Sequence, residues 1–181
     1  MLRPRDIPNL ISILRILLVV PVVVLLLDEQ YQWALVLFFV AGASDGLDGF
    51  LARHFHWQSH LGGILDPLAD KLLLVSVYLC LGWLGALPVL LVALVLLRDL
   101  VIVGGAVAYH LRVEKLEARP TLVSKLNTLM QILLVLAVMA DLGVYRLPAG
   151  LVQGLIWAVA ITTTLSGLDY VVSWGRKARR G

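Results

Sequence analysis

Long apolar runs alternate with short polar segments along this chain. A helix needs about twenty residues to cross the hydrocarbon of a bilayer, and six runs reach roughly that length: residues 10–27, 31–53, 61–81, 88–110, 122–140 and 148–173. Residues 1–9 are polar and contain two prolines, so we expect them to lie at the membrane interface. The pattern predicts an all-α integral membrane protein with six transmembrane helices and a short N-terminal interfacial segment.

Lysine and arginine concentrate on one side of this predicted topology. That side has both termini, the turn at 54–60 and the basic loop at 111–121, whereas Arg146 is the one basic residue in the turns of the other side. Short loops rich in Lys and Arg remain in the cytoplasm. We therefore expect both termini to face the cytoplasm.

Composition excludes an ordinary soluble domain. Of 181 residues, 60% are apolar and 15% charged, with a mean hydropathy of +0.92, whereas soluble domains are roughly half apolar and a quarter charged. A net charge of +3 is compatible with nucleic-acid binding, but the basic residues near the termini flank apolar runs. That position favours anionic lipid headgroups as partners, with no nucleic acid. We expect one membrane domain covering residues 1–181.

Four aspartates stand out because ionised residues at membrane depth are costly and usually functional. Asp45 and Asp48 are three residues apart, and Asp66 and Asp70 are four apart, so each pair shares one face of its helix. The short turn at 54–60 makes the two helices antiparallel neighbours and brings both pairs to a similar depth. The spacing predicts that four carboxylates converge.

Divalent cations are the simplest way to hold four converging carboxylates in a medium of low dielectric constant. Ligands that are all oxygen favour Mg²⁺ or Mn²⁺, and two such ions can stabilise both the attacking and the leaving oxygen of a phosphoryl displacement. The residues alone leave two alternatives open. The aspartates could pair with Arg53, Lys71 and Arg98 to hold the helices together, or they could line a pathway for ions or protons.

The same stretch carries a longer pattern, which reads Asp45-x2-Asp48-Gly49-x2-Ala52-Arg53-x8-Gly62-x3-Asp66-x3-Asp70. It resembles the signature of the CDP-alcohol phosphotransferase family, with every position of that signature filled. The resemblance implies a six-helix fold, usually a homodimer, in a bacterial or mitochondrial inner membrane. It also implies a reaction in which an acceptor hydroxyl attacks the lipid-side phosphorus of a CDP-linked donor and CMP leaves.

The resemblance also assigns roles to individual residues. Asp45, Asp48 and Asp66 would bind the metal ions, and Asp70 would contribute to the metal site and act as the general base. Another set would contact the CDP part of the donor: Gly49, Arg53, Ser59 and Gly62.

The amino-terminal run resembles a second motif of the family. It reads Ile7-Pro8-Asn9-Leu10-Ile11-Ser12-x2-Arg15. The resemblance implies that Asn9 and Ser12 help to hold the nucleotide, and a role there would also explain Arg15, an arginine at membrane depth.

Two subfamilies resemble the chain over nearly its whole length. The run Arg119-Pro120-Thr121-Leu122-Val123-Ser124-Lys125-Leu126-Asn127-Thr128-x2-Gln131 looks more like the CMP-forming cardiolipin synthases than the phosphatidylglycerophosphate synthases, and so does Leu97-Arg98-Asp99. The second subfamily typically has Glu at position 99, Gly at 124 and a second Lys at 127. A less cationic acceptor pocket suits phosphatidylglycerol, a singly charged diester, better than glycerol 3-phosphate.

Basic residues are the candidates for holding the phosphate of the acceptor: Arg98, Lys125, Arg119 and Arg112. Arg98 and Asp99 are adjacent in the middle of the fourth apolar run. Because neighbouring residues point about 100° apart on a helix, we expect these two side chains to serve different partners.

Three histidines lie in the turn between the two acidic helices. His54, His56 and His60 accompany Trp57, a combination typical of the membrane interface. A zinc site would need a helical pair of ligands with further ligands nearby, so we interpret the histidines as interfacial.

Overall fold

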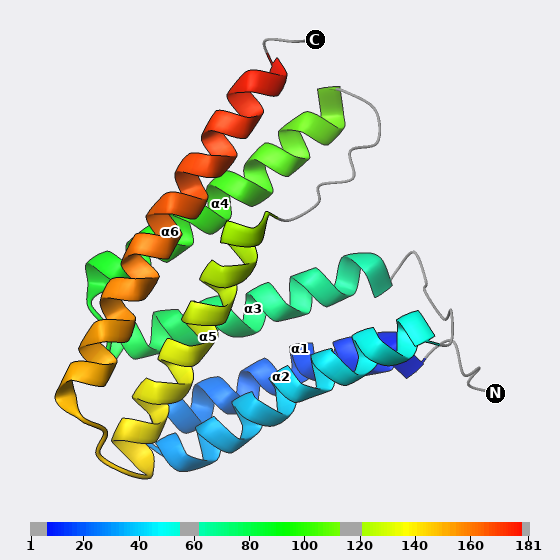
Figure 1. Cartoon of the computed structure of the whole chain (residues 1–181). Coiled ribbons are helices and arrows are strands. Elements are labelled where there is room, and N and C mark those ends of the chain that lie inside the picture. Colours follow the sequence, from blue (N-terminus) through cyan, green and yellow to red (C-terminus); the bar gives the residue numbers. More distant parts are fainter. Residues whose placement is uncertain (1–6, 55–61, 113–120, 179–181) are drawn as a thin grey trace. The chain divides into compact units, whose positions relative to one another are not determined.

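The computed structural model describes residues 7–54, 62–112 and 121–178, and every regular element in these ranges is an α-helix (Figure 1). Within these ranges, the side chains described are those of residues 10–44, 68–102, 121–148 and 150–170. The helices are α1 (Ile7–Leu27), α2 (Tyr31–His54), α3 (Gly62–Trp83), α4 (Val89–Arg112), α5 (Leu122–Gly143) and α6 (Ala149–Ala178). They follow the six predicted runs in order, which confirms the all-α class.

Helix ends differ from the prediction by up to five residues, and two of these differences have a clear physical reason. α1 begins at Ile7 rather than after the polar segment, because proline is tolerated in the first turn of a helix, where its missing N–H has no partner to lose. α6 continues to Ala178, past Trp174, because a helix that leaves the hydrocarbon can continue into the interface with basic residues.

Three helices of the described chain are long and apolar enough to cross a membrane: Leu10–Leu27 in α1, Leu122–Gly143 in α5 and Gly150–Tyr170 in α6. In α2 the apolar stretch among the described side chains covers Tyr31–Ser44, and Asp45 and Asp48 follow it in the same helix. α3 carries ionisable residues in its first ten positions. The structure thus fits a membrane protein, and the count of six spans stays a prediction.

The chain divides into two compact units. Unit 1 contains α1, α2, α3 and residues 138–146; unit 2 contains α4, residues 122–137 of α5, and α6. In unit 1, α1 packs against both α2 and α3, and α2 also touches α3. Its buried apolar side chains follow helical spacing: Val22 and Leu26 in α1, Ala34, Phe38 and Ala41 in α2, and Ala69, Leu73, Val77 and Leu81 in α3. The small alanines let the helix backbones approach one another.

The turns after α1 and α3 share one geometry. Glu29 and Gly85 both have positive φ, at 57° and 72°. At the end of α1, Gln30 N donates to Leu25 O and Glu29 N to Leu26 O; at the end of α3, Ala86 N donates to Leu81 O. These are the bonds of a Schellman cap, which satisfies the last carbonyls of a helix.

Unit 2 buries polar side chains beside apolar ones, and it exposes large apolar side chains. α4 packs along α6, and its buried side chains include Arg98 and Asp99, with Asn127, Gln131 and Ser166 from the other two helices. Large apolar side chains such as Leu90, Leu97, Leu100 and Leu165 are exposed. A soluble protein rarely exposes large apolar side chains in this way while it encloses charged ones. Exposed leucines together with enclosed charges are what a bilayer favours.

Candidate functional site

The signature aspartates all lie in unit 1. Asp45 and Asp48 fall in the last ten residues of α2, and Asp66 and Asp70 in the first nine residues of α3. The two helices contact each other and both pack on α1. The backbone therefore puts the acidic pairs at the ends of α2 and α3 that the 55–61 segment joins, as the sequence predicted. The side chains of Asp45, Asp48 and Asp66 lie outside the described side chains, so their convergence stays a prediction.

Asp70 is the signature aspartate whose side chain is described. Its Oδ1 accepts a hydrogen bond from Arg15 Nη1 at 3.4 Å. The Arg15 side chain is 0% exposed and that of Asp70 is 46% exposed. An arginine enclosed between membrane helices needs an anionic partner, and Asp70 is one. The Asp70 side chain is thus partly exposed while it pairs with Arg15.

The predicted nucleotide contacts Asn9 and Ser12 lie on α1, in the turns before Arg15. Asn9, Ser12 and Arg15 follow one another at three-residue spacing, and Ser12 and Arg15 are both buried. The side chain of Asn9 is outside the described side chains. A contact of Ser12 with a nucleotide stays a prediction.

The remaining predicted contacts to CDP cannot be placed as side chains. Gly49 and Arg53 belong to the last turns of α2, and Gly62 is the first residue of α3. Ser59, His56 and His60 lie outside the described residues. Among the side chains that the structure describes, no group of three His, Cys, Asp or Glu residues gathers as a metal site. This leaves the predicted metal ligands untested, because three of them lie outside that set.

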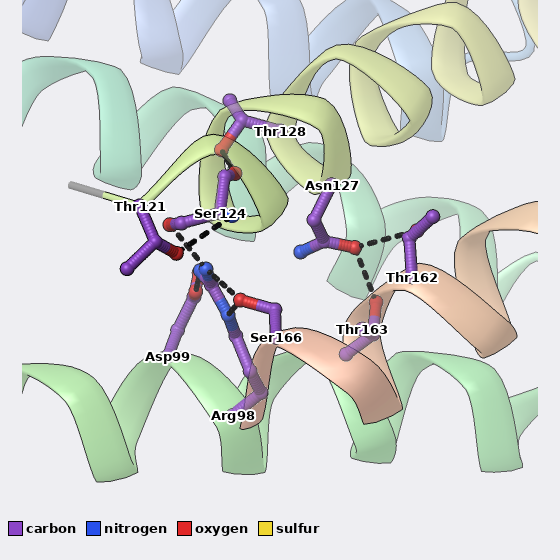
Figure 2. A network of polar contacts seen from close by, with 9 residues as sticks. All are labelled: Arg98, Asp99, Thr121, Ser124, Asn127, Thr128, Thr162, Thr163 and Ser166. Carbon is purple, nitrogen blue, oxygen red and sulfur yellow. Dashed lines mark hydrogen bonds and ion pairs between the residues drawn. The ribbon is translucent and has the colours of Figure 1, made fainter. Parts of the chain in front are cut away.

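Unit 2 contains a polar cluster around Arg98, which Figure 2 shows. Arg98 Nη1 donates to Asp99 Oδ1 at 2.7 Å. Arg98 Nη2 donates to Ser124 Oγ on α5 at 2.6 Å and to Ser166 Oγ on α6 at 2.7 Å, and Nε donates to Ser166 Oγ at 3.2 Å. The guanidinium therefore connects α4, α5 and α6.

The prediction that Arg98 and Asp99 serve different partners is wrong. The Cα–Cβ directions of adjacent residues do diverge, but the long arginine side chain folds back until its guanidinium meets the neighbouring carboxylate. Both side chains are buried, at 4% and 7% exposure. In a medium of low dielectric constant a buried charge is best compensated by the nearest opposite charge.

A second part of the cluster centres on Asn127 of α5. Its Oδ1 accepts hydrogen bonds from Thr162 Oγ1 at 2.9 Å and Thr163 Oγ1 at 2.8 Å, both on α6 (Figure 2). Thr162, Thr163 and Ser166 were not singled out from the sequence. The available signal was a run of hydroxyl residues that interrupts an otherwise apolar helix.

The other predicted acceptor contacts do not join this cluster as described side chains. Lys125 is exposed and follows Ser124 on α5. Arg112 is the last residue of α4, with its side chain outside the described side chains, and Arg119 lies outside the described residues. Arg98 is thus the basic residue of this set for which the structure gives contacts.

Comparison with known proteins gives a family match over most of the chain. The CDP-alcohol phosphatidyltransferase family matches residues 5–166. The chain is 34% identical to a protein named cardiolipin synthase (CMP-forming) from Rattus norvegicus, over 96% of this chain and 63% of the rat protein.

Two further relatives are named CDP-diacylglycerol–glycerol-3-phosphate 3-phosphatidyltransferase. The one from Oryza sativa, a chloroplastic protein, is 33% identical over 93% of this chain and 57% of its own length. The one from Cereibacter sphaeroides is 32% identical over 84% of this chain and 71% of its own length. The chain spans less than two thirds of the length of the rat and rice proteins. On the family match and these relatives, the chain belongs to the CDP-alcohol phosphatidyltransferase family.

Proposed function

We propose that this protein transfers a phosphatidyl group from CDP-diacylglycerol to a hydroxyl group of a glycerol-type acceptor and releases CMP. The observation that carries the proposal is the complete aspartate signature on α2 and α3, in a chain that matches the family over residues 5–166. The helical ends of α2 and α3 that bear the signature belong to one compact unit. Both helices pack on α1, which bears the second motif.

In the proposed reaction the acceptor oxygen forms a new bond to the lipid-side phosphorus, and the bond from that phosphorus to the CMP oxygen breaks. Asp70 accepts the proton of the attacking hydroxyl, and CMP leaves with the bonding electron pair. Asp70 suits this role because its side chain is partly exposed while Arg15 holds one of its oxygens. A general base must reach the proton that it removes.

Divalent ions, Mg²⁺ or Mn²⁺, are the proposed cofactors. The donor set fits them, because Asp45, Asp48, Asp66 and Asp70 offer carboxylate oxygens only. When bound, such ions neutralise charge on the diphosphate and on the leaving CMP. The proposed contacts to the CDP part of the donor are Asn9, Ser12, Gly49, Arg53, Ser59 and Gly62.

The proposed acceptor is phosphatidylglycerol, with cardiolipin as the product. This choice is supported by the neutral Asn127 and by the internal balance of Arg98 by Asp99, which together limit the positive charge available to an acceptor phosphate. The candidate contacts to the acceptor phosphate are still Arg98, Lys125, Arg119 and Arg112. The alternative acceptor is glycerol 3-phosphate, because relatives named for that substrate match the chain with similar identity.

The test is to supply the purified protein with CDP-diacylglycerol, Mg²⁺ and one acceptor at a time. We expect CMP release that depends on both metal and acceptor, and a product with the mass of cardiolipin. A product with the mass of phosphatidylglycerophosphate would show that glycerol 3-phosphate is the acceptor, in the same type of reaction. Ion or proton flux through proteoliposomes without CMP release would show that the protein is a transporter and not this enzyme.

A further inference from the structure

The polar cluster of unit 2 holds hydrogen-bond donors that lack acceptors. Ser124 Oγ and Ser166 Oγ both accept from Arg98. A serine hydroxyl that accepts still keeps its own proton to donate. In the part of the chain that the structure describes, neither of these two hydroxyl protons has an acceptor.

Asn127 contributes two more donor hydrogens. Asn127 is 0% exposed, and among the described residues its Nδ2 has no hydrogen-bond partner. The orientation of the amide is fixed by Thr163, whose hydroxyl bonds to Oδ1 and has no other acceptor in the described chain. Turning the amide over would leave the Thr163 proton without a partner. The NH₂ group therefore points away from the two threonines, as Figure 2 shows.

A buried donor without a partner costs free energy and is rare in native proteins. Here such donors share one cluster, on α5 and α6 beside Arg98. What they lack is a group that accepts hydrogen bonds. Because Asp99 balances the charge of Arg98 at 2.7 Å, the cluster offers donors with little net positive charge.

We propose that Asn127 Nδ2, with the hydroxyls of Ser124 and Ser166, binds the phosphodiester oxygens of the acceptor, so that Asn127 selects phosphatidylglycerol over glycerol 3-phosphate. A phosphodiester has oxygens that only accept hydrogen bonds and carries one negative charge. A monoester carries nearly two charges and requires a cation that is not already balanced. Thr162 and Thr163 are positioning residues, because they act through Asn127. This inference rests on the proposed function.

The first arm of the test uses steady-state kinetics with donor and acceptor varied separately. Asn127→Leu should raise the KM for phosphatidylglycerol by roughly tenfold, the size expected for one lost hydrogen bond to a charged group, and leave the KM for CDP-diacylglycerol unchanged. Its preference for phosphatidylglycerol over glycerol 3-phosphate should fall by a similar factor. Equal changes in both KM values, or none, would overturn the proposal.

Thr163→Val and Thr164→Val form a matched pair. Thr163 is buried and bonds to Asn127 Oδ1, whereas Thr164 is exposed and bonds to Ala160 O of its own helix at 2.8 Å. We expect Thr163→Val to raise the KM for phosphatidylglycerol and Thr164→Val to leave it as in the wild type. The same effect from both substitutions would count against a positioning role.

The last arm does not need turnover. Native mass spectrometry of the detergent-solubilised protein should show phosphatidylglycerol bound more tightly than diacylglycerol, with this preference lost in Asn127→Leu. If the wild type bound phosphatidylglycerol in this way but released no CMP, the proposed reaction would be wrong. The proposed binding of phosphatidylglycerol at Asn127 would still be supported. Equal binding of the two lipids by the wild type would remove the subsite.

Discussion

Arg15 and Arg98 are buried arginines whose charges are compensated in different ways. Arg15 reaches a carboxylate that is nearly half exposed, whereas Arg98 pairs with the buried Asp99. A buried ion pair adds little net stability, but removing one partner is costly because it leaves the other charge uncompensated. The two arginines therefore call for different experiments.

Removing the Asp99 carboxylate should destabilise the protein strongly. We expect Asp99→Ala to cost about 3 kcal/mol of unfolding free energy, because the Arg98 guanidinium loses its anion, and Arg98→Met combined with Asp99→Leu to recover most of that loss. Unfolding in mixed micelles measures both. Asp28→Asn, in the exposed turn after α1, is the control. If the double variant were less stable than Asp99→Ala, the pair would be stabilising in its own right.

At Asp70 the expected effect is on turnover. Asp70→Asn keeps an oxygen for Arg15 and removes the proton acceptor, so we expect CMP release to fall by roughly a hundredfold or more, with phosphatidylglycerol bound as before. Asp28→Asn again serves as the control. Wild-type turnover in Asp70→Asn would exclude this residue as the base.

The positions of the residues could be predicted more fully than their contacts. The spacing of the aspartates placed all four on α2 and α3, since helical periodicity depends on sequence alone. The Arg98–Asp99 pair and the bond from Thr163 to Asn127 could not be predicted, because they depend on rotamers and on the register between helices that are distant in sequence. The roles of the aspartates came from the family signature.

At the scale of the elements, the apolar runs predicted the order of the helices, and the caps decide where α1 and α3 end. Both end in a residue with positive φ, and the sequence uses glycine at only one of them. A residue with a Cβ atom pays roughly 1–2 kcal/mol in this conformation. Substitutions at the two caps should therefore change the stability of the protein in opposite directions.

We expect Glu29→Gly to stabilise the protein by about 1 kcal/mol and Gly85→Ala to destabilise it by about the same amount. Thermal unfolding in detergent is the measurement. Gly154→Ala is the comparison, because a Cβ at Gly154 meets nothing within 4 Å. If Gly85→Ala and Gly154→Ala changed the unfolding temperature equally, the positive φ of the cap would not be the reason for glycine at position 85.

The end of α5 depends on a close approach. A Cβ on Gly143 would lie 2.6 Å from the backbone N of Gln32 and 2.9 Å from the backbone C of Tyr31. Backbone atoms at the start of α2 cannot move aside without shifting the helix. We expect Gly143→Ala to cost about 1–3 kcal/mol of stability, as for other overpacked sites, and Gly150→Ala, at an open position of α6, to have little effect. Equal unfolding temperatures for these two variants would rule out the close approach.

At the scale of the whole molecule, composition predicted a membrane protein and the burial pattern agrees. Arg15 and Arg98 are enclosed, while leucines such as Leu17 and Leu100 are 62% and 70% exposed. The aspartates that the proposed chemistry uses lie in α2 and α3 and add charge to these two helices.

The most direct measurement is the binding of Mn²⁺ to the purified protein, followed by electron paramagnetic resonance. We expect two Mn²⁺ ions per chain with a coupled spectrum, reduced to one uncoupled ion or none in Asp45→Asn and in Asp66→Asn, with CMP release lost in parallel. Asp169→Asn, in α6, should bind as the wild type does. Full turnover of a protein that binds no divalent ion would contradict the shared carboxylate site.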